Sequence, residues 1–293
     1  MAGFHYVDIL VNAVLAIIML GLGLTLTFRD FKQILVLPKA IITGLGVQIF
    51  IIPLIAYGVA VISGLSPEQK VGIVLVSTCA SGASSNLITH LVRGNVALAI
   101  SMTTLNSFIT LVTLPSIVSL ALFLFLGKET HIFLPVDKTI LQIFLVTIVP
   151  AALGVVIKHY RSRFADNMEK PLKIILPVAL FLVFALKIFG GKGQGGSGMT
   201  FSEALDIFPY VLLLNVLAML AGYFVSKLLR LKFRNQYTIA IEVGLHNTAL
   251  ALLVAGSIIQ SPEMEKPALV YAIFSFFSAI IFVYTLKGKK IFK

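Results

Sequence analysis

Long apolar stretches alternate with short polar segments along almost the whole chain. A helix that crosses the hydrocarbon core of a bilayer needs about 20 mostly apolar residues. This pattern predicts an all-α polytopic membrane protein with about nine transmembrane helices, because a membrane β-barrel would instead show short alternating strands. The nine stretches cover residues 4–27, 39–63, 70–92, 95–126, 139–157, 171–190, 207–229, 236–258 and 267–286.

Composition supports this reading and excludes several other classes. The 293 residues are 58% hydrophobic and only 12% charged, and the mean hydropathy is +1.02. Soluble domains carry roughly 25% charged residues. These values exclude a soluble enzyme, a disordered protein and a nucleic-acid-binding module, although the net charge is +11.

The excess of basic residues is explained by membrane topology. With the N-terminus outside and the C-terminus cytoplasmic, most Lys and Arg residues fall on the cytoplasmic side, as the positive-inside rule requires. A basic cluster lies between the fifth and sixth stretches, whereas Lys187 and Lys266 belong to the few basic residues assigned outside. Splitting the stretch 95–126 at Pro115 would place the later basic segments outside, which favours one helix there.

Two stretches are interrupted by polar residues and glycine. One interruption covers residues 77–86, and the other covers residues 242–248. Gly together with Ser, Thr and Asn favours a discontinuous helix. The interruptions occupy the third and eighth helices, which run in opposite directions. We therefore predict an inverted repeat, with a first repeat of four helices over 1–126 and a second of five over 127–293.

Glu242 is the one acidic residue within the polar part of a span. A carboxylate inside a membrane is costly and usually functional, and a bound Na⁺ would neutralise it. Asn86 and Asn247 either join helices or belong to a site. His246 has three open roles: cation ligand, proton relay or structural hydrogen-bond partner.

At these interruptions the sequence resembles the bile acid:sodium symporter family, including its bacterial homologues. The matching features are Ser85-Asn86 followed by Arg93-Gly94-Asn95, Gln48 ahead of Pro53, and Glu242-Val243-Gly244 ending in Asn247. The resemblance implies a core and a panel domain, each drawn from both repeats, with two crossing broken helices and without the family's first helix. It also implies a multi-pass protein of the bacterial inner (plasma) membrane that works by alternating access.

The resemblance further implies two sodium sites and a neighbouring substrate site. Two departures concern these sites: His246 stands where the family commonly has Gln, and Phe274-Ser275-Phe276 stands where relatives often have Trp-His-Asn. The second departure favours a small carboxylate over a bile acid. The implied sodium ligands are Gln48, Ser85, Asn86, Thr103, Glu242, the carbonyls of Val243 and Leu245, and His246, and the implied substrate contacts are Ser81, Ser84, Asn247 and Thr248.

We therefore expect a sodium-coupled symporter of an organic anion, either a small carboxylate or a bile-acid-like molecule. Its expected partners are Na⁺, the organic anion and the lipid bilayer, with no nucleic acid; the sequence does not indicate an oligomeric state. One alternative is proton coupling through Glu242 and His246. A remote alternative is an intramembrane hydrolase with Ser81 or Ser84 as nucleophile and His246 or His90 as base, although we expect no enzyme.

Overall fold

The protein is all-helical over the residues described by a computed structural model, which are 6–26, 36–127, 134–190 and 196–288. In the first half the helices are α1 (Tyr6–Thr25), α3 (Pro38–Gly46), η1 (Val47–Ile51), α4 (Ile52–Ile62), α5 (Pro67–Thr78), α6 (Ala83–Leu91) and α7 (Val96–Leu126). In the second half they are α8 (Val136–Ile143), η2 (Phe144–Ile148), α9 (Val149–Tyr160), α10 (Ser162–Phe189), α11 (Phe201–Leu228), α12 (Phe233–Gly244), α13 (Thr248–Leu252), η4 (Leu253–Ile258) and α14 (Pro262–Lys287).

Five helical segments are long and apolar enough to cross a membrane: Pro38–Ile62, Val96–Leu126, Val136–Tyr160, Phe201–Leu228 and Pro262–Lys287. This is the architecture of a polytopic membrane protein, as predicted. The helix α7 continues through Pro115, so the prediction of one helix there is confirmed. Two of the other four predicted spans correspond to interrupted helices, and two correspond to α1 and α10, whose apolar parts are shorter. The total of nine stays a prediction.

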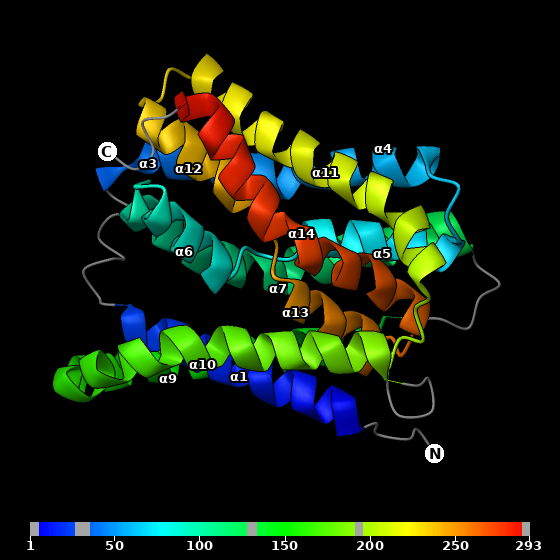
Figure 1. The fold of residues 1–293 in the computed structure, drawn as a ribbon, viewed down its shortest axis with the longest axis horizontal. Coiled ribbons are helices and arrows are strands. Elements are labelled where there is room, and N and C mark those ends of the chain that lie inside the picture. Colours follow the sequence, from blue (N-terminus) through cyan, green and yellow to red (C-terminus); the bar gives the residue numbers. More distant parts are fainter. Residues whose placement is uncertain (1–5, 27–35, 128–133, 191–195, 289–293) are drawn as a thin grey trace.

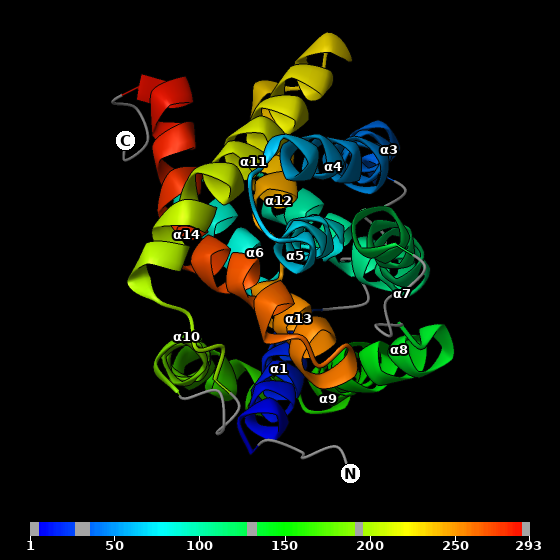
Figure 2. The ribbon, with the colours of Figure 1, turned by 90° about the vertical axis from the view of Figure 1, so that its right-hand side faces the viewer.

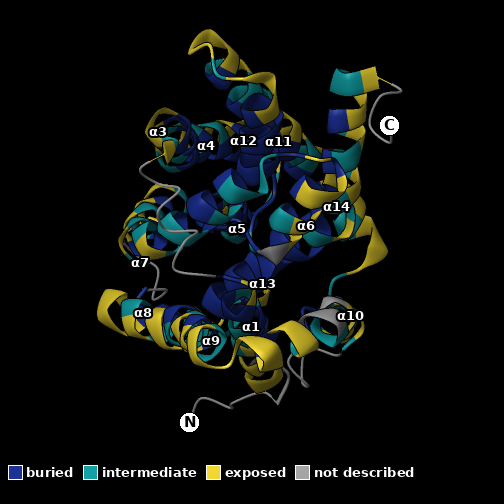
Figure 3. Ribbon diagram, turned by 90° about the vertical axis from the view of Figure 1, so that its left-hand side faces the viewer, coloured by how far each residue is buried: buried dark blue, intermediate teal, exposed yellow. Residues whose placement is uncertain are grey.

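The helices form two layers. Helices α1, α8, α9 and α10 lie together on one side of the molecule, and the remaining helices form a larger group on the other side (Figures 1 and 2). The short helix α13 lies between the layers and contacts α1. Buried residues gather around α5, α12 and α13, whereas exposed residues mark the outer faces of α8 and α9 (Figure 3).

The smaller layer is held together by very close helix packing between α1 and α9. A Cβ atom at Gly23 would lie 2.1 Å from the Ala151 carbonyl oxygen, and one at Gly154 would lie 2.4 Å from the Leu20 carbonyl oxygen. Only glycine allows two backbones to approach this closely, which is a common device for packing helices in membranes.

Two of the long helices contain a π-helical segment that ends two residues before a proline. The segment η1 precedes Pro53, and η2 precedes Pro150. Proline cannot donate a backbone hydrogen bond, and wider π-helical turns are frequent near functional sites. The segment η1 contains Gln48, one of the predicted sodium ligands.

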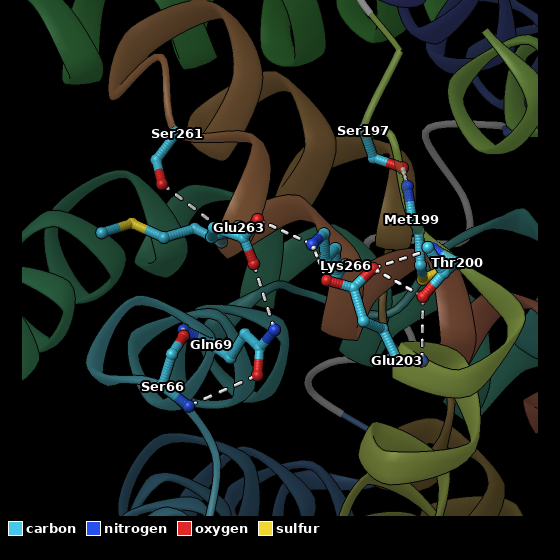
Figure 4. A network of polar contacts seen from close by, with 10 residues as sticks. Ser66, Gln69, Ser197, Met199, Thr200, Glu203, Ser261, Glu263 and Lys266 are labelled. Carbon is cyan, nitrogen blue, oxygen red and sulfur yellow. Dashed lines mark hydrogen bonds and ion pairs between the residues drawn. The ribbon is translucent and has the colours of Figure 1, made fainter. Parts of the chain in front are cut away.

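One end of the larger layer is joined by a polar network that connects α5, α11 and α14 (Figure 4). Lys266 Nζ lies 2.8 Å from Glu203 Oε1 and 2.6 Å from Glu263 Oε1. Gln69 Nε2 donates to Glu263 Oε2 at 3.1 Å. Gln69 and Glu203 also complete capping boxes with Ser66 and Thr200, so the network fixes the first turns of all three helices.

A further ion pair connects the two layers. Lys187 Nζ of α10 lies 2.6 Å from Glu265 Oε1 of α14, and both side chains are only 2% exposed. The sequence assigned Lys187 and Lys266 to the outer side of the membrane, and in the structure both lie in helices and are buried. Each lysine has carboxylate partners that offset the cost of burial.

Three hydrogen bonds join the connection between α6 and α7 to α12. Arg234 Nη2 donates to the Gly94 carbonyl at 2.8 Å, and the Tyr237 hydroxyl donates to the Arg93 carbonyl at 2.9 Å. The backbone nitrogen of Asn95 donates to Thr238 Oγ1 at 2.9 Å. Residues that carry part of the family resemblance therefore join α12 to the helices after the first interruption.

The basic cluster between the fifth and sixth predicted stretches does not form a separate loop. Helix α9 ends at Tyr160 and α10 begins at Ser162, so the basic residues mostly lie within helices. Lys158 Nζ pairs with Asp166 Oδ1 at 2.5 Å across this junction. Charged residues extend both helices beyond their apolar segments, which hydropathy alone does not predict.

Candidate functional site

The first polar interruption separates α5 from α6. Helix α5 ends at Thr78, Cys79 and Gly82 adopt extended backbone conformations, and α6 begins at Ala83. Ser77 and Thr78 donate their hydroxyl hydrogen bonds to carbonyls three residues earlier in α5, at 2.6 and 2.8 Å. Such local bonds compete with regular helix geometry. The predicted break is confirmed here.

The second interruption separates α12 from α13. Helix α12 ends at Gly244, and Leu245 is extended, with φ −116° and ψ 100°. Asn247 then caps α13, since its side-chain oxygen accepts from the Leu250 backbone nitrogen at 3.1 Å. The predicted break is confirmed here as well.

The two breaks lie side by side. Ser81 and His246 form an isolated antiparallel β-bridge, and the Asn247 backbone nitrogen donates to the Ala80 carbonyl at 2.8 Å. Extended backbone from one interruption therefore satisfies extended backbone from the other. This pairing places the ends of four half-helices at one point.

Glu242 lies beside these paired breaks, in the last turn of α12, and is 2% exposed. Its Oε2 atom accepts hydrogen bonds from Ser81 Oγ at 2.5 Å and from Thr103 Oγ1 at 2.8 Å. The two hydroxyl oxygens are 2.9 Å apart. Oε1 is buried and has no hydrogen-bond partner among the described residues. One carboxylate oxygen is therefore satisfied by protein hydroxyls and the other is available.

A second polar group adjoins the breaks and contains Gln48 and His246. Gln48 Nε2 lies 3.2 Å from the Ser77 carbonyl and 3.5 Å from His246 Nδ1. His246 Nδ1 is also 3.3 Å from the Cys79 carbonyl, whereas its buried Nε2 has no partner in the described part of the chain. The structure thus brings a residue of η1 together with both breaks.

The other predicted sodium ligands flank this point. Ser85 is buried and donates to the Gly82 carbonyl at 2.8 Å. Both amide atoms of Asn86 are buried without a hydrogen-bond partner among the described residues. Val243 is the second-last residue of α12, and Leu245 lies in the extended segment that follows the helix.

The four predicted substrate residues do not share one environment. Ser81 is buried against Glu242 and Thr103, so the structure places it with the predicted sodium ligands. Ser84 is exposed at the beginning of α6, and Asn247 is partly exposed at the beginning of α13. Thr248 is buried in the first turn of α13.

The donor set suits a hard monovalent cation. Glu242 Oε1 and Asn86 Oδ1 are buried oxygen atoms that lack partners within the described chain, and such atoms are costly unless something satisfies them. The carboxylate also lies near the C-terminal end of α12, where the helix dipole favours positive charge. Among the described residues there is no group of three His, Cys, Asp or Glu side chains, the ligands typical of a transition metal.

Among the described contacts, the Ser81 and His246 side chains do not form the nucleophile–base pair that the hydrolase alternative needs. Ser81 Oγ bonds to Glu242 and Thr103, and His246 Nδ1 lies near Gln48 and the Cys79 carbonyl. A nucleophile and its base must be within hydrogen-bonding reach of each other. In the described contacts Ser81 and His246 meet through their backbones, and their side chains have other partners.

Two residues at the second break were not singled out from the sequence. Asn215 of α11 and Tyr271 of α14 both donate to the Gly244 carbonyl, at 2.7 and 2.6 Å. Asn215 could have been found from the sequence, because it is an amide within the mostly apolar stretch 207–229. A buried amide needs a hydrogen-bond partner. Nothing in the spacing of Tyr271 indicated its role.

Comparison with known proteins gives consistent matches. The sequence profile of the Sodium Bile acid symporter family matches residues 12–194. The chain is 29% identical to the "Uncharacterized sodium-dependent transporter YocS" of Bacillus subtilis (strain 168), over 92% of this chain and 80% of that protein. It is 31% identical to the rice protein "Probable sodium/metabolite cotransporter BASS2, chloroplastic", over 87% of this chain and 58% of that protein. It is 25% identical to the rabbit (Oryctolagus cuniculus) ileal sodium/bile acid cotransporter, over 92% of this chain and 76% of that protein.

Proposed function

The chain belongs to the Sodium Bile acid symporter family, and on that premise we propose that it couples Na⁺ entry to uptake of an organic anion by alternating access. The observation that carries the proposal is the Glu242 carboxylate, which is buried between two helix breaks with Oε1 available. Relatives named as sodium-dependent transporters and sodium/bile acid cotransporters support Na⁺ as the coupling ion.

We assign the first ion site to Glu242, Ser85, Asn86 and Thr103, and we add Ser81 because of its bond to Glu242. Hydroxyl, amide and carboxylate oxygens together form a shell that suits Na⁺. The hydroxyls of Ser81 and Thr103 hold Oε2 in place and leave Oε1 toward the ion.

We assign the second ion site to Gln48, Glu242, His246 and the carbonyls of Val243 and Leu245. Gln48 already lies within 3.5 Å of His246 Nδ1. A neutral imidazole is a softer ligand than the amide oxygen of Gln, so this site is the weaker of the two for Na⁺.

We place the substrate anion against the beginnings of α6 and α13, next to Ser84, Asn247 and Thr248. Helix N-termini favour negative charge, and Ser84 is exposed and Asn247 partly exposed at these two positions. A small carboxylate is the favoured substrate, and a bile-acid-like anion is the alternative.

Transport would then move the two helix layers against each other around this site. We equate the layer of α1, α8, α9 and α10 with the panel domain and the remaining helices with the core domain. The protein would lie in the plasma membrane with its N-terminus outside and its C-terminus in the cytoplasm.

The proposal is tested by thermal unfolding of the detergent-purified protein in Na⁺ and in K⁺ at equal ionic strength. A ligand that binds only the folded state stabilises it by about 2.7 kcal/mol at a hundredfold excess over Kd. We expect a Na⁺-specific rise in the unfolding temperature of the wild type and none for Glu242→Gln. Equal temperatures in Na⁺ and K⁺ for the wild type would overturn sodium coupling.

Proton coupling is the second candidate, because His246 Nε2 is buried at the same pair of helix breaks as Glu242 and has no hydrogen-bond partner among the described residues. Uptake of a carboxylate into proteoliposomes under a pH gradient in sodium-free buffer would favour that version. Uptake that needs a sodium gradient would exclude it.

A further inference from the structure

The C-terminal end of α12, at the second break, is held by a brace formed by Asn215 of α11 and Tyr271 of α14. Asn215 Nδ2 and the Tyr271 hydroxyl both donate to the Gly244 carbonyl, at 2.7 and 2.6 Å, and Asn215 Nδ2 is also 2.9 Å from that hydroxyl. Both side chains are fully buried. Carbonyls in the last turn of a helix lack partners within the helix, so these two donors satisfy one that the break frees.

The brace fixes which way the next carbonyl points. Leu245 is extended, and successive carbonyls of an extended chain point to opposite sides. Since the Gly244 carbonyl faces Asn215 and Tyr271, the Leu245 carbonyl faces the other way. That direction is toward residues 80–82, where the Asn247 backbone nitrogen already bonds to Ala80.

Several contacts keep the brace rigid. Ser278 Oγ lies 2.6 Å from Asn215 Oδ1, which sets the orientation of the amide. The Tyr271 ring lies against His246, with 5.5 Å between ring centroids. A Cβ atom at Gly244 would lie 2.3 Å from Met219 Cγ, so α11 contacts the break directly.

We propose that Asn215 and Tyr271 are positioning residues for the sodium sites, an inference that rests on the proposed function. They contact no ion themselves. By holding the Gly244 carbonyl they set the direction of the Leu245 carbonyl, the place of the Glu242 carboxylate two residues earlier and the packing of His246. Their loss therefore lowers sodium affinity more than it lowers the stability of the sodium-free protein.

The test compares Tyr271→Phe with Tyr57→Phe. The Tyr57 hydroxyl of α4 also donates to a helix carbonyl, that of Ile117 in α7, at 2.8 Å, but away from the breaks. Each variant loses one hydroxyl bond to a carbonyl, and Tyr271→Phe also removes the hydroxyl that accepts from Asn215 Nδ2. Unfolding temperatures are measured across a titration of NaCl against KCl, so that stability in K⁺ and the Kd for Na⁺ are obtained separately.

We expect Tyr271→Phe to bind Na⁺ about fivefold more weakly, as one lost hydrogen bond predicts, and Tyr57→Phe to match the wild type. Asn215→Leu, measured in the same way, gives a second weakened variant. Unchanged sodium affinity in Tyr271→Phe, beside a Na⁺-specific rise in the wild type, would overturn the positioning role alone. A wild type without any Na⁺-specific rise would overturn the proposed function and this inference together.

Discussion

Ser81 and Glu242 are 161 residues apart in the sequence, yet the Ser81 hydroxyl donates to Glu242 Oε2 at 2.5 Å. Ser81 belongs to the break between α5 and α6, and Glu242 to the end of α12. The bond joins the two interrupted helices through their side chains, beside the β-bridge that joins their backbones. Any separation of the breaks has to break this bond.

Ser81→Ala should lower sodium affinity, because Oε2 then keeps only the Thr103 hydroxyl and the carboxylate loses its fixed orientation. The matched control is Ser84→Ala, which changes an exposed serine three residues later. We expect about a fivefold or larger increase in the Kd for Na⁺ for Ser81→Ala and no change for Ser84→Ala. A Na⁺ titration of unfolding temperature measures both, and equal effects would remove Ser81 from the ion site.

Lys187→Met should destabilise the protein by about 3–5 kcal/mol, because it leaves the buried Glu265 carboxylate without its lysine. Adding Glu265→Met should recover most of that loss of stability, since neither charge of this pair then remains buried. Lys158→Met serves as the control, because its partner Asp166 is 59% exposed and such pairs contribute about 1 kcal/mol or less. Urea unfolding in detergent reports all three, and a double variant as unstable as the single one would contradict the pairing.

Gly154→Ala should disturb the smaller layer, because the added methyl would lie 2.4 Å from the Leu20 carbonyl oxygen. Overpacking of this kind costs about 1–3 kcal/mol. Gly58→Ala in α4 is the matched control, since nothing lies within 4 Å of its added carbon. Thermal unfolding should show a lower transition temperature only for Gly154→Ala. Equal temperatures would mean that α1 and α9 are packed less closely than described.

His246→Gln should strengthen the second ion site, because an amide oxygen replaces a ring nitrogen beside Gln48. We expect tighter Na⁺ binding than in the wild type, and weaker binding for His246→Ala, which removes the ligand altogether. Isothermal calorimetry with NaCl distinguishes the two. If Gln and Ala at this position weaken binding equally, the imidazole itself is the ligand or the proton carrier.

Much of the fold follows from hydropathy, and the reasons for the exceptions are physical. The stretch 95–126 matches α7 within one residue at its start, because its ends are marked by Asn95 and Gly127. The helix α10 begins at Ser162, well before the predicted residue 171, because helices continue past the apolar segment that hydropathy detects. The hydropathy pattern therefore predicts the apolar part of a helix but not the residues at which the helix begins and ends.

The candidate site was predictable where polarity was out of place in an apolar stretch. Glu242, Asn86 and the two glycine-containing polar interruptions were found in that way. The partners of those residues were not, because contacts such as Asn215 with Gly244 depend on how helices far apart in the sequence pack. Ser81 was placed toward the substrate for the same reason, since only the packing of α12 brings Glu242 to it.

Helix α14 carries Glu265 in its first turn and Tyr271 less than two turns later, a rise of about 9 Å along the axis. The first residue is paired with α10 of the smaller layer, and the second is bonded to the Gly244 carbonyl. No loop interrupts the backbone between them. Because this part of α14 is continuous helix, we expect a change in the spacing of the two layers at Lys187 to shift the backbone that forms the break.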